Sequence, residues 1–189
     1  MHETTRHRLF FALWPDAEIA SHLHALGADL VEHARGRGRV MPAESMHMTV
    51  AFVGSVTSVQ RDALIKSANS IQCDAFDVSL DRLGFWPRGG VLYAGSSAGG
   101  GVMPCRQSRL FDAVRDLILR SNLPHDGRVQ VPHVTLARNV RGPDLPRLGS
   151  PVSWHANEFG LVESQLHSSG ARYKALATWP LHTSSDDED

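Results

Sequence analysis

The sequence predicts an α+β protein built from two related halves. Stretches with the alternation of β-strands are interspersed with stretches whose apolar residues recur at helical spacing. Two motifs of the form His-x-Thr, His47-Met48-Thr49 and His133-Val134-Thr135, occupy corresponding places in this order of elements. The chain of 189 residues, 42% of them hydrophobic and 21% charged, is large enough to bury one compact core.

The first half is expected to begin with a strand at residues 8–14. A helix follows from Asp16 and should end near Arg35, because its apolar residues recur at helical spacing. The first His-x-Thr motif lies on the next strand, and a second helix is expected at residues 56–71.

The second half is expected to open with a hairpin, whose strands at residues 76–85 and 91–94 flank the turn Pro87-Arg88-Gly89-Gly90. A loop rich in glycine and serine separates this hairpin from an amphipathic helix at residues 106–120. The second His-x-Thr motif then lies on a strand of its own.

Two more strands, at residues 159–166 and 173–180, should close the fold. A single domain is therefore expected to span residues 1–182. Residues 183–189 are acidic and lack apolar side chains, which predicts a disordered tail.

Charge is balanced over the chain, with a formal net charge of −1 at pH 7. A protein held on duplex nucleic acid by many phosphates would need an overall basic field, so any nucleic-acid contact must be local. Lys66 and Lys174 are the only lysines, and arginine's planar fork suits phosphate, although a GC-rich genome would produce the same bias. The loop Arg35-Gly36-Arg37-Gly38-Arg39 could contact an RNA backbone, but a solvated loop is the simpler interpretation.

The two cysteines, Cys73 and Cys105, lack the paired spacing of a zinc site and the density of a secreted disulfide protein. They are expected to be reduced thiols with a structural role. The apolar stretch at residues 9–14 is too short for a signal peptide or a membrane segment. The sequence therefore predicts a cytoplasmic protein without a membrane partner.

The strand period of two places the polar side chains of each motif on one face. His47, Thr49 and Ala51 should share the polar face of the first motif, and the opposite face, which includes Phe52, should pack against the core. The second motif repeats the arrangement, with His133 and Thr135 together. A third match, residues 2–4, lies in a polar N-terminal segment without alternation and is interpreted as chance.

Two histidines that face each other across a groove supply an acid and a base near neutral pH, because an imidazole pKa of roughly 6.5 keeps both protonation states accessible. Threonine hydroxyls can donate hydrogen bonds to the oxygens of a phosphate. This set of groups suits in-line displacement at phosphorus without a metal or another cofactor.

The chain resembles the two-histidine (2H) phosphoesterases, and within them the RNA 2′,3′-cyclic phosphodiesterases that are also called 2′-5′ RNA ligases. The resemblance covers nearly the whole chain. It is carried by residues 8–13, 47–54, 91–95, 132–138 and 169–176.

The resemblance implies a bilobal fold with two pseudo-symmetric lobes of antiparallel sheet plus helices around a central groove. It implies hydrolysis of the 2′,3′-cyclic end of RNA to a 2′-phosphomonoester, with a weak reverse ligation. His47 would be the proton donor and His133 the proton acceptor, while Arg138 would bind phosphate although strict alternation places it opposite His133. Phe11 is a candidate for stacking on a base.

Other enzyme classes fit less well. Gly95-Ser96-Ser97-Ala98-Gly99 matches the Gly-x-Ser-x-Gly elbow of serine hydrolases, but more glycine follows instead of a helix. His22 and His24 are two residues apart and would point to different sides of a helix, which disfavours a metal site. An ATP-dependent ligase would need a reactive lysine in a Lys-x-Asp-Gly context, and no such context occurs.

A noncatalytic module that binds RNA ends in the same groove is the main alternative from another class. Turnover of a nucleoside 2′,3′-cyclic phosphate would distinguish the two. The expected partner in either case is RNA with a cyclic phosphate end, and the protein is expected to be a monomer that uses no ATP.

Overall fold

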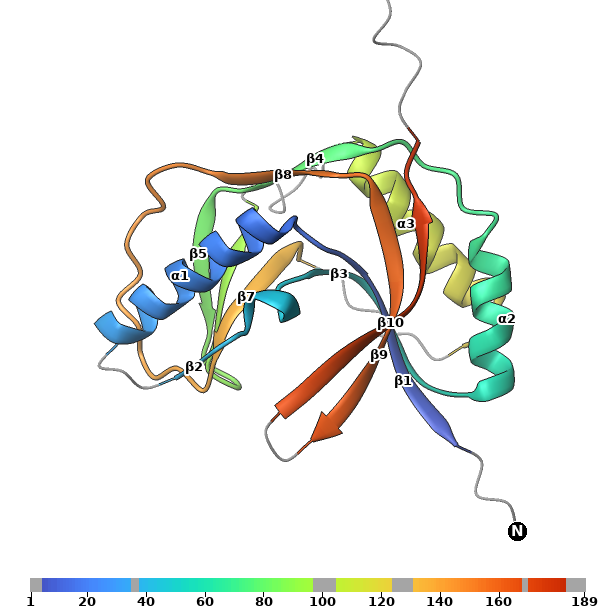
Figure 1. Ribbon diagram of the computed structural model, residues 1–189, viewed down its shortest axis with the longest axis horizontal. Helices are drawn as coiled ribbons and strands as arrows, with labels where there is room; N and C mark the ends of the chain where they lie inside the picture. Colours follow the sequence, from blue (N-terminus) through green and yellow to red (C-terminus); the bar gives the residue numbers. More distant parts are fainter. Residues whose placement is uncertain (1–4, 35–37, 97–104, 124–130, 168–169, 183–189) are drawn as a thin grey trace, which may run out of the picture.

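The computed structural model describes residues 5–34, 38–96, 105–123, 131–167 and 170–182 (Figure 1). Its elements follow the expected alternation of strands and helices. The helices are α1 (Ala17–His33), α2 (Ser58–Ala68) and α3 (Cys105–Arg120), with a short 3-10 helix at Ala43–Ser45. The strands are β1 (Arg6–Leu13), β2 (Arg39–Val40), β3 (Met48–Thr57), β4 (Phe76–Leu80), β5 (Arg82–Trp86), β6 (Val91–Gly95), β7 (His133–Arg138), β8 (Val152–Ala156), β9 (Glu158–His167) and β10 (Gly170–Pro180).

The main sheet is antiparallel and consists of two halves that meet at the two motif strands. Its strand order is β10-β9-β1-β3-β7-β6-β5, and β2 pairs with β7 outside this path. β3 and β7 pair through Met48 and Val134, the middle residues of the two motifs. Because the ladder between β3 and β7 is this short, the sheet opens on either side of the junction, and the expected α+β fold with two lobes is confirmed.

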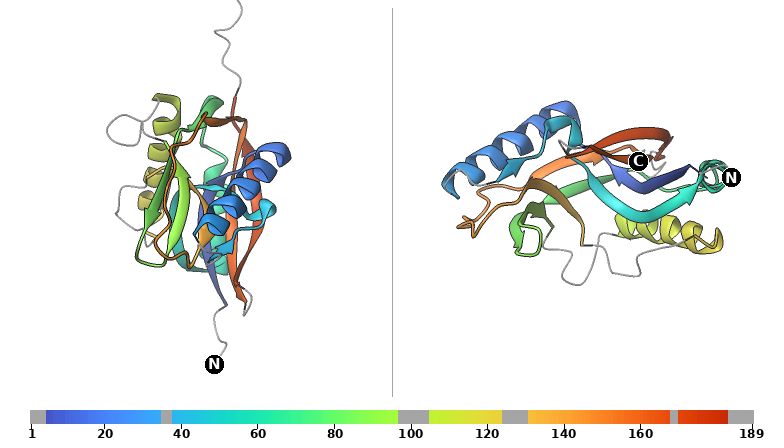
Figure 2. Two further views of the ribbon diagram at one scale, coloured as in Figure 1. Left: turned by 90° about the vertical axis from the view of Figure 1, so that its left-hand side faces the viewer. Right: turned by 90° about the horizontal axis from the view of Figure 1, so that it is seen from below.

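The helices are divided between the two lobes. Helix α1 packs against β7 and β2, whereas α2 and α3 pack against β3 and against each other. Figure 2 shows α1 and α3 at opposite ends of the molecule with the strands between them. Each helix buries an apolar stripe, which on α3 includes Leu110, Val114 and Ile118.

Local sequence signals explain where two helices begin. The carboxylate of Asp16 accepts a hydrogen bond from the backbone of Ile19 at 2.8 Å and caps α1. Thr57 and Gln60 form a capping box, so α2 begins at Ser58. The expected start at residue 56 was wrong because Val56 still belongs to β3, where it is fully buried.

The expected single strand at residues 76–85 is in fact two strands in different sheets. β4 pairs with β8 in a separate two-stranded sheet, and β5 pairs with β6 in the main sheet. The chain changes sheets at Asp81, whose backbone N–H donates to the carbonyl of Gly95. β8 was not predicted from the sequence, although Val152, Trp154 and Ala156 are buried in strict alternation with exposed neighbours.

One hydrophobic core extends under both lobes, and a smaller cluster of Phe10, Ala12 and Val162 lies beside it. Both cysteines are free thiols; Cys105 is exposed and Cys73 is half-buried. Among the helices of the described segments, none has the length and apolarity needed to span a bilayer. The acidic tail at residues 183–189 lies outside the described residues.

Candidate active site

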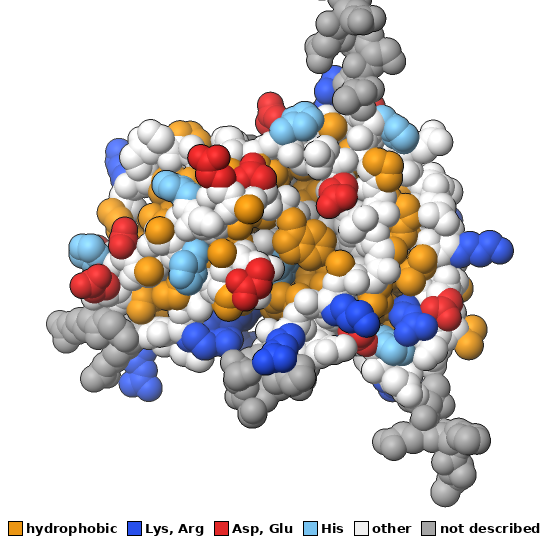
Figure 3. Space-filling view, viewed as in Figure 1, with side chains coloured by type: hydrophobic (Ala, Val, Ile, Leu, Met, Phe, Trp, Pro, Cys, Tyr) orange, Lys and Arg blue, Asp and Glu red, His pale blue; other side chains and the backbone are white. Residues whose placement is uncertain are grey.

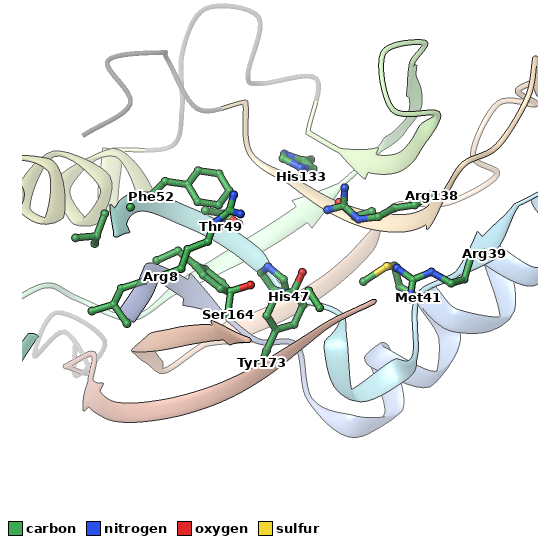
Figure 4. Close-up of a pocket in the computed structure, with 16 residues that line it drawn as sticks. Arg8, Arg39, Met41, His47, Thr49, Phe52, His133, Arg138, Ser164 and Tyr173 are labelled. Carbon is green, nitrogen blue, oxygen red and sulfur yellow. The ribbon is translucent and has the colours of Figure 1, made fainter. Parts of the chain in front are cut away.

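The four motif side chains line one groove of about 750 Å³ between the lobes. Figure 4 shows His47 and His133 on opposite walls of this groove. Their arrangement follows from the Met48–Val134 pair, because the side chains that flank an antiparallel pair point to the same face of the sheet. The structure therefore brings together His47, Thr49, His133 and Thr135, as expected.

The groove is electropositive. Three arginines line it, Arg8, Arg39 and Arg138, and no carboxylate is found among the described residues that form its walls. The remaining lining side chains are mostly apolar or aromatic, such as Met41, and one further hydroxyl comes from Ser164. A groove with this composition is suited to an anionic ligand that has an aromatic or apolar part.

The backbone holds both imidazoles in the same way. Nδ1 of His47 donates to the carbonyl of Ser45 at 2.7 Å, and Nδ1 of His133 donates to the carbonyl of Val131 at 2.6 Å. A carbonyl can only accept, so each neutral ring carries its proton on Nδ1. Nε2 of each ring is left for the groove, where it can accept a proton or, once protonated, donate one.

Aromatic side chains fix the ring of His47. Phe10 lies 5.0 Å from it and Tyr173 lies 4.9 Å from it, measured between ring centroids. Tyr173 meets the imidazole edge-on, at an interplanar angle of 79°. These contacts restrict rotation of His47 and remove it from water.

A second pair of aromatic side chains fixes the ring of His133. Trp86 and Tyr93 are stacked at 4.2 Å, and both meet the imidazole edge-on, at 4.6 Å and 5.5 Å. Gly84 lies opposite Tyr93 in the ladder, and a Cβ at Gly84 would lie only 2.2 Å from the tip of the tyrosine ring. The absence of a side chain at Gly84 therefore gives Tyr93 its place.

Burial makes both histidines weaker bases than expected from the sequence. Burial lowers the pKa of His47 from 6.5 to about 4; the hydrogen bond to Ser45 opposes this shift, and the charges of His133 and Arg138 add to it. Burial also lowers the pKa of His133; the hydrogen bond to the backbone of Val131 opposes this shift, and the charge of Arg138 adds to it. Both imidazoles are therefore neutral at pH 7 in the unliganded groove, so an acid form must be generated when an anion binds.

Arg138 lines the groove together with His133 and Thr135. Strict alternation would have turned it away, but a bulge at Leu136 changes the alternation. Leu92 pairs with Ala137 and Tyr93 pairs with Thr135, which leaves Leu136 without a partner in this ladder. With Leu136 as an extra residue, Leu136 and Ala137 both face the core, and Arg138 returns to the groove face.

A bulge also corrects the expected faces of the first motif strand. Ala12 pairs with Thr49 and Phe11 pairs with Ala51, so Val50 is the extra residue. Ala51 consequently packs toward the core, and Phe52 lies in the groove with 40% of its surface exposed. The prediction that Phe52 faces the core was therefore wrong.

The candidate for base stacking was also wrong. Phe11 is fully buried and packs between Phe159, at 6.3 Å, and Trp179, at 6.1 Å. A base cannot reach it without opening the core. Its neighbour Phe10 is on the groove side, as the alternation of β1 would have indicated.

Other residues were considered from the sequence for a metal site, a serine nucleophile and an RNA-backbone contact. No group of three potential metal-ligating side chains occurs within the segments that the structure describes. His24 donates from Nδ1 to the carbonyl of Met41 at 2.8 Å, and His22 is exposed on α1. Ser97 of the Gly-x-Ser-x-Gly match, residues 2–4 and residues 35–37 of the arginine-rich loop lie outside the described residues.

Several groove residues were not predicted from the sequence. Arg8 and Ser164 were not singled out as site residues, and Arg39 was considered only as part of a loop. The aromatic residues around the histidines were missed because their partners come from distant strands. Alternation along β1 alone could have found Arg8.

Comparison with known proteins identifies the family. A family model described as LigT-like phosphoesterase matches residues 13–93. The RNA 2′,3′-cyclic phosphodiesterase of Escherichia coli strain K12 is 31% identical over 176 residues, which cover 92% of this chain and 96% of that protein. A crystal structure of a phosphoesterase has a TM-score of 0.85 at 29% identity and covers 95% of this chain and 100% of its own. The crystal structure of E. coli LigT with 3′-AMP has a TM-score of 0.82 at 30% identity and covers 94% of this chain and 99% of its own. The chain is therefore a two-histidine phosphoesterase of the LigT-like family.

Proposed function

We propose that this protein hydrolyses the 2′,3′-cyclic phosphate end of RNA to a 2′-phosphomonoester. The main support is the pair of imidazoles that present Nε2 to one groove from opposite walls. The E. coli relative is named for this substrate, and a structure of E. coli LigT contains the nucleotide 3′-AMP. An electropositive groove with aromatic walls is suited to a nucleotide of this kind.

The proposed reaction is a single in-line displacement at phosphorus. Nε2 of His133 removes a proton from water as the water oxygen forms a bond to phosphorus. The bond between phosphorus and O3′ breaks on the opposite side, and Nε2–H of His47 gives its proton to O3′. The phosphate remains on O2′, and one water is consumed. The assignment of His47 as acid and His133 as base follows the family resemblance.

The acid form of His47 depends on the substrate. Because the pKa of His47 is about 4 in the unliganded groove, the imidazole binds no proton at pH 7. A phosphodiester anion next to the ring favours the imidazolium and raises its pKa. Substrate binding is therefore coupled to the uptake of a proton from solvent by His47, and this proton is the one that the leaving oxygen needs.

Thr49, Thr135 and Arg138 are proposed to hold the phosphate oxygens. They share the groove face with the two histidines. Their hydroxyl and guanidinium donors would stabilise the charge that develops on the nonbridging oxygens in the transition state. The same groups would support a weak 2′-5′ ligation, in which the 5′-hydroxyl of a second RNA takes the place of water: O5′ forms a bond to phosphorus, the bond between phosphorus and O3′ breaks, and O3′ takes up the proton.

The test is product analysis on a short RNA that ends in a 2′,3′-cyclic phosphate, in the presence and absence of EDTA. We expect a 2′-phosphate end in both cases, because the two imidazoles supply the proton transfers. A 3′-phosphate product would reverse the leaving group and contradict the acid assignment. Loss of turnover in EDTA that zinc or manganese restores would contradict the metal-independent mechanism. Tight binding of the RNA without turnover would support the noncatalytic alternative.

A further inference from the structure

We propose that Ser58, His7 and Glu163 form a second reactive site, in which Ser58 is a nucleophile that takes up acyl groups from esters. The three side chains lie where β1, β9 and the start of α2 meet, and none of them lines the groove between the lobes. The inference does not depend on the proposed hydrolysis of cyclic phosphates. It adds an acyl-transfer reaction that uses none of the four His-x-Thr side chains.

The strand register brings the histidine and the carboxylate together. Leu9 of β1 pairs with Glu163 of β9, and His7 is the next residue on the same face of β1. His7 itself pairs with Val56, which precedes Ser58 by two residues. The end of β3 therefore places the first residue of α2 on the other side of the imidazole.

The hydrogen bonds have the order of a nucleophile, a base and an orienting acid. Nδ1 of His7 donates to Oε1 of Glu163 at 2.5 Å, because an ionised carboxylate can only accept. The neutral ring therefore carries its proton on Nδ1 and accepts at Nε2, where the hydroxyl of Ser58 donates at 3.0 Å. Both contacts are short enough for a histidine to activate a serine as its general base.

The surroundings keep the imidazole and the carboxylate in this state. His7 is only 9% exposed. Its hydrogen bond holds the pKa of Glu163 below the usual range, although partial burial opposes the shift, so the carboxylate is ionised at neutral pH. A carboxylate at Nδ1 stabilises the imidazolium that forms when Nε2 takes the serine proton. Glu163 is thus a positioning residue, since it acts on Ser58 only through His7.

The start of α2 supplies donors for an oxyanion. The first four backbone N–H groups of a helix have no partner within the helix. In α2 the N–H of Gln60 donates to the hydroxyl of Thr57 at 3.2 Å, and the N–H groups of Ser58 and Val59 precede it. The N–H of the residue after a nucleophilic serine is also the donor that serine hydrolases use for the oxyanion.

Arg61 adds a positive charge at the same place. Its Nη1 lies 3.3 Å from Nε2 of His7, and its Nη2 forms an ion pair with Asp62 at 2.7 Å. An arginine has five N–H donors, so these contacts leave others for an oxyanion. Val59, which follows the serine, is 79% exposed and offers an apolar contact. The substrate class that fits is therefore an ester with a small acyl group.

The serine lies at the surface, where a reagent in solution can reach it. Ser58 is half-buried and its neighbour Val59 is exposed. Figure 3 shows basic, acidic and histidine side chains together at the lower right of the surface, in the region where Figure 1 places the lower end of β1 and the start of α2. The mixture of charges at this place matches the cluster of His7, Glu163 and Arg61.

The proposed reaction exchanges one ester bond for another. Oγ of Ser58 forms a bond to the acyl carbon while its proton passes to Nε2 of His7. The bond between the acyl carbon and the alcohol oxygen breaks, and Nε2–H gives the proton to that oxygen. Water then hydrolyses the acyl-serine by the same two proton transfers, so that one water is consumed for each ester.

The experiment exposes the full chain to a fluorophosphonate and locates the label by mass spectrometry. Oγ forms a bond to phosphorus, the P–F bond breaks, and the serine proton leaves with fluoride. Ser58 should react at least roughly 10²-fold faster than Ser67, an exposed serine of the same helix. Ser58→Ala should abolish the label and His7→Gln should slow it by roughly 10²-fold or more, whereas the matched control Ser67→Ala should leave it unchanged. p-Nitrophenyl acetate should acetylate the same residue.

Two further readouts separate a reactive site from a structural contact. Glu163→Gln should lower the maximal rate of labelling without changing the reagent concentration at half-saturation, because it changes the base and leaves access to the serine as it is. Ser58→Ala should hydrolyse cyclic phosphate ends as fast as the wild type. A chain that hydrolyses no cyclic phosphate but is labelled at Ser58 would refute the proposed function and support this site.

Ser58→Cys tests the base without the fluorophosphonate and with His7 in place. Iodoacetamide should alkylate the introduced thiol roughly tenfold or more faster than that of Ser67→Cys, because Nε2 of His7 accepts the thiol proton. This comparison decides the matter if His7→Gln does not fold. Equal alkylation of the two thiols would overturn the proposal, as would equal labelling of Ser58 and Ser67 or undiminished labelling in a folded His7→Gln protein.

Discussion

Met48 and Val134, the middle residues of the two motifs, form the pair that joins the two halves of the main sheet. Both side chains are fully buried. The side chain of Gln107 donates to the sulfur of Met48 at 3.6 Å, which ties α3 to the same point. The junction therefore sets the distance between the two walls of the groove, while its own side chains face the core.

Met48→Ala should destabilise the fold by about 2–5 kcal/mol, because it leaves a cavity at the junction of the lobes. Met48→Leu conserves volume and should cost less than about 1.5 kcal/mol. Urea unfolding measures both. Equal stability of Met48→Ala and the wild type would show that the junction does not hold the lobes together.

Replacement of His47 or His133 by Ala should lower kcat by roughly 10²-fold to 10⁴-fold each, the range for positioned acid and base groups. Since the two act as a unit, the double variant should lose far less than the product of the single losses. Each variant should still fold, because both side chains line the groove; circular dichroism checks this. A folded His47→Ala protein with full activity would refute the mechanism.

Arg138→Lys should raise KM by roughly tenfold although the charge is retained. Lysine cannot reproduce a bidentate grip on phosphate. Steady-state kinetics on a cyclic-phosphate substrate provides the measurement. Unchanged constants would remove Arg138 from the phosphate site.

The pH profile of kcat/KM should be bell-shaped, with its maximum on the acidic side of 6.5. In the proposed mechanism the active form has one imidazolium and one neutral imidazole. Burial lowers the pKa of both histidines, that of His47 to about 4. As the pH rises through these lowered values, the free enzyme loses the required proton. The profile of kcat should lie at higher pH, because the bound anion raises the pKa values. A falling limb of kcat/KM that begins only above pH 7 would contradict this assignment.

Gly84→Ala should lower kcat by up to roughly 10²-fold, the effect of a misplacement of about 1 Å near the chemistry. The new Cβ would displace the ring tip of Tyr93, and with it the stack on Trp86 that orients His133. In a Tyr93→Leu background the same change should have little further effect, which a double-mutant cycle would detect. Gly149→Ala is the control, because a Cβ there meets nothing within 4 Å.

Much of the site could be predicted from local pattern. Alternation placed His133 and Thr135 on one face, and the resemblance assigned Arg138 to phosphate against that alternation. The errors occur where a bulge adds a residue to a strand. Phe52 and Arg138 both reach the groove because Val50 and Leu136 are extra residues, and neither bulge contains a glycine or proline that would mark it.

The sequence by itself determined the class of the fold, most of its elements and the two motifs. The periodicity of a strand or a helix depends only on the order of apolar and polar residues along a short stretch of chain. Only the tertiary structure decided how the two motifs come to share one groove, since a single pair, Met48 with Val134, brings together strands that are far apart in the chain. It also decided the protonation of the histidines. Removal of both imidazoles from water, by aromatic side chains on neighbouring strands, lowers their pKa values, and that desolvation is a property of the packed groove and of no residue alone.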